Sequence, residues 1–268
     1  MNHLRRGLAP ISDAAWAEVD EEAARALKTF LAARRLVDFD GPLGWDTACV
    51  GTGRLDTLAP APVDGVSGGV RRVVPMLELR ATFELSLAEL DAIDRGAADP
   101  DLDPVVDAAR RIALAEDRLV FEGRGEVGAA GLLTSTPHEV IDIDPDYARF
   151  PALIARAAAQ LRDAGVDGPY ATVLGPRCYY GVVEGTEKGG YPVLNHVELI
   201  TGGPLVRARA IDGAALVSMR GGDYELTVGQ DLSIGYLGHT AETVTLYIEE
   251  SLAFRNLAPE ATVALRHP

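Results

Sequence analysis

The sequence predicts a mixed α+β fold in which helices and strands alternate along the chain. Two long helices, expected at 12–34 and 104–122, carry apolar residues at helical spacing. Residues 77–87 alternate apolar and polar side chains, which is typical of a long strand with one face in water. The segment 51–69 is rich in Gly and Pro, so we expect an arm without a core of its own, ordered by a neighbouring chain.

The composition sets the class of protein. The chain has 268 residues and is 47% hydrophobic, enough for one large or two modest domains. No apolar run approaches the roughly 20 residues that span a membrane, and residues 1–10 lack the apolar core of a secretory signal. The two cysteines, Cys49 and Cys178, stand far apart without a CxxC motif, which suits reduced thiols. We therefore expect a cytoplasmic protein with no membrane partner.

The charge balance bears on the partners. Forty acidic residues against 25 basic ones give a formal net charge of −15. Such a surface repels phosphate backbones, and the sequence has no basic tail or stripe. We expect no nucleic-acid partner.

Capping signals mark the two long helices. Ser12 is expected to cap the first helix, with Asp13 near the positive end of its dipole. The apolar face of this helix consists of Trp16, Val19, Ala23, Leu27, Phe30 and Leu31. Asp103 is expected to cap the second helix, with Pro104 in its first turn and Gly123 at its end.

The second half of the chain is expected to mix shorter elements. A helix at 150–164 is followed by a strand at 170–175, a short helix near 177–185 and a Gly-rich loop at 185–195. The remainder is expected to be mostly strands, at 213–219, 223–228, 243–254 and 261–265. Because there is no internal repeat or Ser-rich linker, we expect interleaved domains.

No motif predicts catalysis. Residues 65–69, GVSGG, match the G-x-S-x-G nucleophile motif, but that motif needs a strand before Ser67 and a helix after it. The five histidines do not have the spacing of metal ligands, and neither phosphate-loop nor dinucleotide motifs are complete. We therefore predict a protein that is not an enzyme, with no catalytic residue, no metal and no cofactor.

Several long blocks stand in a specific order along the chain: LAPISDAAWAEVD, ELRATFELSLAELDAIDRG, AEDRLVFEG, GGDYELTVGQDLSIGY and FRNLAPEA. Together they resemble the encapsulins, the shell proteins of bacterial nanocompartments. The resemblance, to the linocin-like group of family 1 type encapsulins, covers essentially the whole chain. It implies a tailed-phage major-capsid-type fold. Ala88 stands where some members carry an aromatic residue that stacks a flavin, so no flavin is expected.

The resemblance also implies a domain organisation. Residues 1–40 would form an N-terminal helix and lumen-facing segment. Residues 41–131 would form a peripheral domain, with an extended arm at about 51–74 and a spine helix at about 104–122. Residues 132–220 would form an axial domain that meets its copies around fivefold axes, and 221–268 would supply return strands of the peripheral domain.

The implied function is assembly and enclosure. The chain would form an icosahedral shell of about 60 copies. The shell would enclose a cargo protein, a dye-decolourising-type peroxidase or a ferritin-like protein, through its C-terminal targeting peptide. Two alternatives stay open: a phage-type capsid protein, which the acidic charge disfavours, and a bacteriocin or hydrolase, which the context of Ser67 disfavours.

The cargo peptide is expected to dock between the first helix and residues 228–238, VGQDLSIGYLG. The expected apolar strip is Leu31, Phe39 and Ile234, with Lys28, Arg34 and Asp38 as charges on its rim. Gly229 and Gly235 would allow tight turns. Asp231 is either part of this binding site or a structural residue of a strand bend.

The Gly-rich loop is expected to line the fivefold pore. Gly189 and Gly190 permit tight turns, and three charged side chains would set the local field. The expected pore residues are Glu184, Glu187, Lys188, Gly189, Gly190 and Tyr191.

Overall fold

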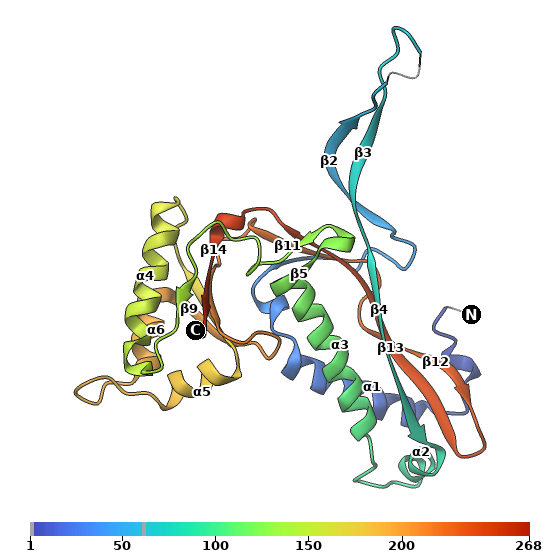
Figure 1. Ribbon diagram of the computed structural model, residues 1–268. Coiled ribbons are helices and arrows are strands. Elements are labelled where there is room, and N and C mark those ends of the chain that lie inside the picture. The colour runs from blue at the N-terminus through green and yellow to red at the C-terminus, as the bar shows by residue number, and fades with distance from the viewer. Residues whose placement is uncertain (1–2, 61–62) are drawn as a thin grey trace.

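Two five-stranded sheets and a projecting hairpin organise the chain (Figure 1). This computed structural model describes residues 3–60 and 63–268. Residues 1–2 of the predicted N-terminal segment and 61–62 of the predicted arm lie outside the described residues.

The first sheet is built around one long strand, β13 (Thr243–Asn256). Strand β4 (Leu77–Ser86) pairs antiparallel with one edge of β13. Strands β11 (Tyr224–Val228) and β12 (Ser233–His239) pair with the other edge, end to end, and β1 (Asp38–Asp40) pairs with β11. The predicted alternation at 77–87 is confirmed, because Ala81, Phe83 and Leu85 are buried while their neighbours are exposed.

The second sheet has the order β7 (Ile141–Asp142), β14 (Thr262–Arg266), β10 (Ala214–Ser218), β8 (Tyr170–Leu174) and β9 (Gly202–Arg207). Helices α4 (Phe150–Asp163), α5 (Pro176–Glu184) and α6 (Val193–Thr201) lie beside it in one lobe (Figure 1). Strand β14 belongs here, so the segment 221–268 is divided between the two sheets. A strand pattern in the sequence does not reveal which sheet the strand will join.

Three helices lie beside the first sheet. Helix α1 (Asp13–Phe30) packs on α3 (Asp103–Glu122), and α2 (Leu87–Asp94) follows β4. Ser12 caps α1 as predicted, with its Oγ accepting from the Ala15 N–H at 3.1 Å. The α1 helix ends at Phe30, not at 34, because Leu31 is extended. The α3 helix starts at Asp103 itself and Leu102 is its N-cap, which corrects the predicted cap.

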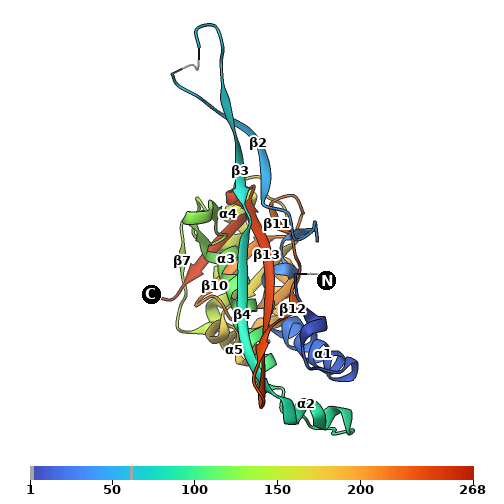
Figure 2. The ribbon, with the colours of Figure 1, turned by 90° about the vertical axis from the view of Figure 1, so that its right-hand side faces the viewer.

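The arm is a two-stranded hairpin of β2 (Cys49–Thr57) and β3 (Gly69–Pro75) that stands away from the body (Figures 1 and 2). The sequence predicted the arm but not strand β2, because β2 has no buried face to impose alternation. A short pair, β5 (Gly123–Arg124) and β6 (Ala129–Ala130), follows α3.

The buried apolar residues form two clusters. One lies among α1, α3 and the first sheet, and the other fills the lobe of the second sheet and extends to β11 and the end of β13. Helix α3 contributes to both, through Ile112 in the first and Phe121 in the second. It therefore connects the two halves of the molecule as a single rigid element.

Candidate functional site

A groove of about 300 Å³ lies between α1 and β12. The helix presents one face to it at the spacing i, i+3, i+4, i+7, which is a single stripe of an α-helix. Strand β12 and the residues just before it form the other wall. The lining residues are Leu4, Arg6, Asp20, Ala23, Ala24, Leu27, Leu232, Ser233, Ile234 and Ile248. The groove is mostly aliphatic, with one pair of opposite charges.

The wall of β12 is tightly packed. Ile234 is only 5% exposed and belongs to the core cluster beneath α1. A Cβ on Gly235 would lie 2.2 Å from Cζ of Tyr247, so a larger residue here would have to displace this buried ring. This corrects the prediction that Gly235 serves a tight turn.

Arg34 is the centre of a buried ionic cluster. Its guanidinium lies 2.7 Å from Glu116 of α3, 3.0 Å from Glu250 of β13 and 2.8 Å from Asp231. The side chains of Glu116 and Glu250 are fully buried, and that of Arg34 is 18% exposed. Arg34 is therefore not a rim charge as predicted, because its contacts are internal. Asp231 is satisfied by this arginine and by the N–H of Leu232 at 2.8 Å.

Asp117 fixes the turn that follows α1. Its carboxylate accepts from the N–H groups of Ala32, at 3.1 Å, and Ala33, at 2.8 Å. Burial raises the pKa of Asp117 to about 7, although these two hydrogen bonds favour the ionised form. Burial and the neighbouring Glu116 also raise the pKa of Glu250 well above its usual value.

The predicted docking residues do not share one surface. Arg34 and Asp38 line a second cavity of about 110 Å³, and the Arg34 guanidinium lies over the ring of Phe39 at 5.2 Å. Phe39 pairs with Leu226, which in turn pairs with Phe254 of β13, whereas Ile234 pairs with Ile248 of β13. Phe254 and Ile248 are six residues apart along the strand, which corresponds to about 20 Å. The expected continuous strip is therefore absent: Ile234 lies in the groove, while Lys28 is exposed and Leu31 half-buried beyond it.

Sequence reasoning missed most of the groove. Ala23 and Leu27 were part of the predicted apolar face of the helix, but Asp20 and Ala24 were not. The periodicity did not separate the residues that face the core from those that face the groove. The N-terminal segment with Leu4 and Arg6 carried no pattern at all. Its place is set by pairing with β12, which is remote in the sequence.

The predicted pore loop forms the far tip of the second lobe, between α5 and α6 (Figure 1). Two backbone hydrogen bonds close within the loop: the Glu187 N–H donates to Tyr191 O at 2.8 Å, and the Gly190 N–H donates to Glu187 O at 2.9 Å. The Glu187 carboxylate lies 2.9 Å from Nδ1 of His196. Glu184 ends α5, and Lys188, Gly189, Gly190 and Tyr191 are exposed. The loop is shorter than predicted because α6 already begins at Val193.

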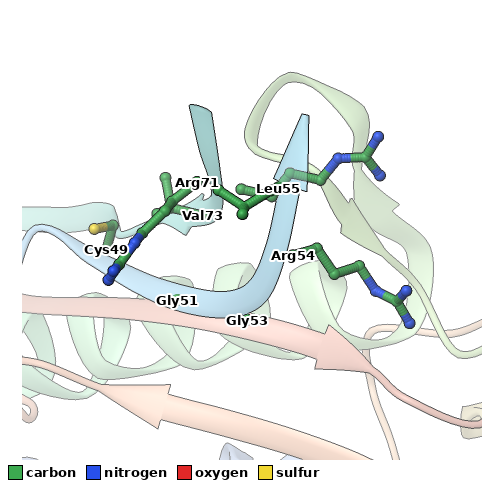
Figure 3. A pocket seen from close by; sticks show the side chains of 8 residues that line it. Cys49, Gly51, Gly53, Arg54, Leu55, Arg71 and Val73 are labelled. Atoms are coloured by element: carbon green, nitrogen blue, oxygen red, sulfur yellow. The ribbon is translucent and has the colours of Figure 1, made fainter. Parts of the chain in front are cut away.

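The arm carries six exposed apolar side chains on one short hairpin. Strand β2 curves around a pocket of about 500 Å³ near Gly51 and Gly53, where its pairing with β3 is irregular (Figure 3). Gly53 has a φ of +72°, which suits the bend. The exposed residues are Leu55, Leu58, Val63, Val66, Val70 and Val73, each between 45% and 66% exposed. A group of exposed apolar side chains of this kind is typical of a surface that contacts another chain.

The structure agrees with the absence of a nucleophile motif at Ser67. Ser67 is exposed near the arm tip and precedes a strand rather than a helix, so it lacks the nucleophile geometry. Within residues 3–60 and 63–268, no cluster of three or more potential ligands could hold a metal ion. In the same part of the chain, no helix combines the length and apolarity needed to cross a membrane.

Comparison with known proteins decides the family. Residues 1–253 match the Linocin_M18 family, described as encapsulating protein for peroxidase. A type 1 encapsulin shell protein of Rhodospirillum rubrum is 53% identical over 271 residues, covering 99% of this chain and 97% of that protein. The chain belongs to the type 1 encapsulin shell proteins. A second such shell protein, from Mycobacterium tuberculosis, is 42% identical over 267 residues, covering 100% of both chains.

Solved structures confirm the capsid-type fold. A virus-like particle of Pyrococcus furiosus matches with a TM-score of 0.65 at 14% identity, covering 92% of this encapsulin chain and 97% of that chain. The capsid of phage XM1 matches with a TM-score of 0.55 at 11% identity, covering 86% and 90%. Such identities show the fold alone. The relatives are named as structural shell proteins, in agreement with the prediction of a protein that is not an enzyme.

Proposed function

We propose that this encapsulin chain forms a closed icosahedral shell of about 60 copies and captures a guest protein by its C-terminal tail in the groove between α1 and β12. The observation that carries the capture is the groove itself. An aliphatic cleft of about 300 Å³ between a helix and a strand suits a short extended peptide. Each aliphatic side chain buried there would contribute roughly 1.5–3 kcal/mol before the cost of ordering the tail.

The arm supports the proposed assembly. It projects from the body without a core, and its exposed aliphatic residues need a neighbouring copy to cover them. The lobe of α4–α6 would meet its copies around the fivefold axis, with the loop after α5 lining the pore. Light scattering of purified protein should give a mass of about 60 chains.

The proposed guest is a dye-decolourising-type peroxidase. The matching family is described by its enclosure of a peroxidase, which supports this choice over a ferritin-like guest. Many copies of the groove on one shell would raise the avidity for a multimeric guest. Mass spectrometry of shells purified from the natural host should identify the guest and the sequence of its tail.

The docking site is tested with that tail. The tail of the co-purified guest, fused to a fluorescent protein, is expressed with wild-type shells and with two variants. Ala24→Glu places a charge on the exposed rim of the groove and should abolish loading. Ala14→Glu, also exposed but on a different face of α1, should load normally. Equal loading of wild type and both variants would place the tail elsewhere.

A further inference from the structure

The groove has a third wall, formed by the N-terminal segment. Residues 3–9 run beside β12 before α1 begins. Leu4 is 9% exposed and lines the groove, and its carbonyl oxygen accepts from the Tyr236 N–H at 2.8 Å. One backbone hydrogen bond thus joins the segment to β12, and one aliphatic side chain lies against the groove.

Arg6 joins this segment to α1. Its Nη1 and Nη2 donate to the two carboxylate oxygens of Asp20, at 3.0 and 2.7 Å. The same guanidinium lies 4.0 Å above the ring of Trp16. Two parallel hydrogen bonds and an aromatic face hold the guanidinium in one orientation. Both charged residues of this pair line the groove.

His3 anchors the other side of Leu4. Its ring stacks on Trp45, with centroids 4.5 Å apart and planes 12° apart. Its Nε2 lies 3.1 Å from the buried carboxylate of Glu249 on β13. Leu4 is therefore held on one side by the contacts of His3 and on the other side by the contact of Arg6 with α1.

We propose that Arg6 is a positioning residue for guest capture: its contact with Asp20 fixes Leu4 as the third wall of the groove. This inference rests on the proposed docking function. Without the contact, the segment would separate from α1 and the groove would open to water on that side. A bound aliphatic side chain would then lose part of its apolar surroundings.

The pair is suited to mutation because it contributes little to folding. The side chains of Arg6 and Asp20 are 31% and 46% exposed, and exposed pairs contribute little to stability. We expect Arg6→Gln and Asp20→Asn each to lower the number of guests per shell by about twofold to fivefold, with shells of normal size. The double variant Arg6→Asp, Asp20→Arg should recover much of the loss, because the contact is restored with its charges exchanged. Arg5→Gln is the matched control, since Arg5 is exposed and makes no ion pair among the described residues.

The probe is the fluorescent protein with the tail of the co-purified guest, so two failures can be told apart. If wild-type shells do not load it, the proposed docking function fails. If wild-type shells load the probe and both single variants load as much of it as wild type, the role of Arg6 is refuted. If the single variants lose loading and the exchanged pair recovers none of it, Arg6 contacts the tail directly and the positioning role is wrong.

A second readout needs no guest. Hydrogen exchange at the Tyr236 amide should be faster in empty Arg6→Gln shells than in wild type or Arg5→Gln, because Leu4 no longer holds its place on β12. An unchanged exchange rate would overturn the inference whatever the loading.

Discussion

The guanidinium of Arg34 lies 2.8 Å from the carboxylate of Asp231, although 197 positions separate them in the sequence. The same group contacts Glu116 and Glu250, so the segment after α1 is joined at one point to α3, to β13 and to the residues leading into β12. Asp231 directly precedes Leu232 of the groove wall. The cluster therefore holds both walls of the groove to the body of the protein.

Removing this arginine should destabilise the protein. Arg34→Met leaves Glu116 and Glu250 buried without their cation, and breaking a buried pair of this kind costs about 3–5 kcal/mol. The thermal unfolding midpoint of the shells, at fixed protein concentration, should fall clearly. Arg35→Met, at an exposed neighbouring position, is the control and should leave the midpoint nearly unchanged. Similar midpoints for the two variants would show that the cluster contributes no net stability.

The stability should also depend on pH through Asp117. Its pKa is about 7 in the folded protein and about 4 in an unfolded chain, so the folded state holds the proton more tightly. The resulting stabilisation is fully present below about pH 4 and is lost as the pH rises through about 7. Between pH 5 and 8 the unfolding midpoint of wild type should therefore fall more steeply than that of Asp117→Asn. Parallel curves would mean that Asp117 does not titrate in this range.

Ile234→Asp should abolish guest loading and also lower the unfolding midpoint. Ile234 is 5% exposed in the core cluster under α1, so the new carboxyl group would be buried without a partner. Ile234→Val keeps the apolar wall and should load guests, at a cost of about 0.5–1.5 kcal/mol in stability. The guest-to-shell ratio and the midpoint are measured on the same preparations. Normal loading of Ile234→Asp would remove β12 from the docking site.

Leu55→Asp should prevent shell formation. Leu55 is 66% exposed on the arm, and a charge there would be desolvated when a neighbouring copy covers it. Light scattering after size exclusion should show small oligomers or monomers. Leu237→Asp changes a leucine that is 51% exposed outside the arm, and this control should assemble. Complete shells from Leu55→Asp would mean that this face of the arm stays in solvent.

Replacing residues 186–191 by a short Gly/Ser linker should widen the fivefold pore without preventing assembly. The replacement stops before Val193, which is buried at the start of α6. A reconstruction of the shell should show the larger opening, and an enclosed fluorophore should be quenched faster by a small ion. Loss of assembly, or a loop located at the arm, would contradict the pore assignment.

Local patterns in the sequence were sufficient to predict the helices and strands whose apolar residues recur at a regular spacing. The face of α1, the alternation of β4 and the length of α3 follow from side-chain periods of about 3.6 and 2, which neighbouring residues express by themselves. The absence of a core in the arm was likewise visible as composition. Strand β2, helix α6 and the sheet that β14 joins were not visible, because their partners are remote and no local period marks them.

The candidate site also has a part that follows from local sequence patterns and a part that depends on the tertiary structure. Ala23 and Leu27 of the groove belong to the apolar helical face that the sequence predicts, whereas Asp20 and Ala24 do not. The role of the stretch before Ile234 in docking stays a prediction. Only the tertiary structure decided that Arg34 is enclosed by three carboxylates and that Leu4 closes the groove beside β12. Burial and ion pairing depend on which distant segments meet. A side chain's charge and its local spacing are the same whether it faces solvent or the interior.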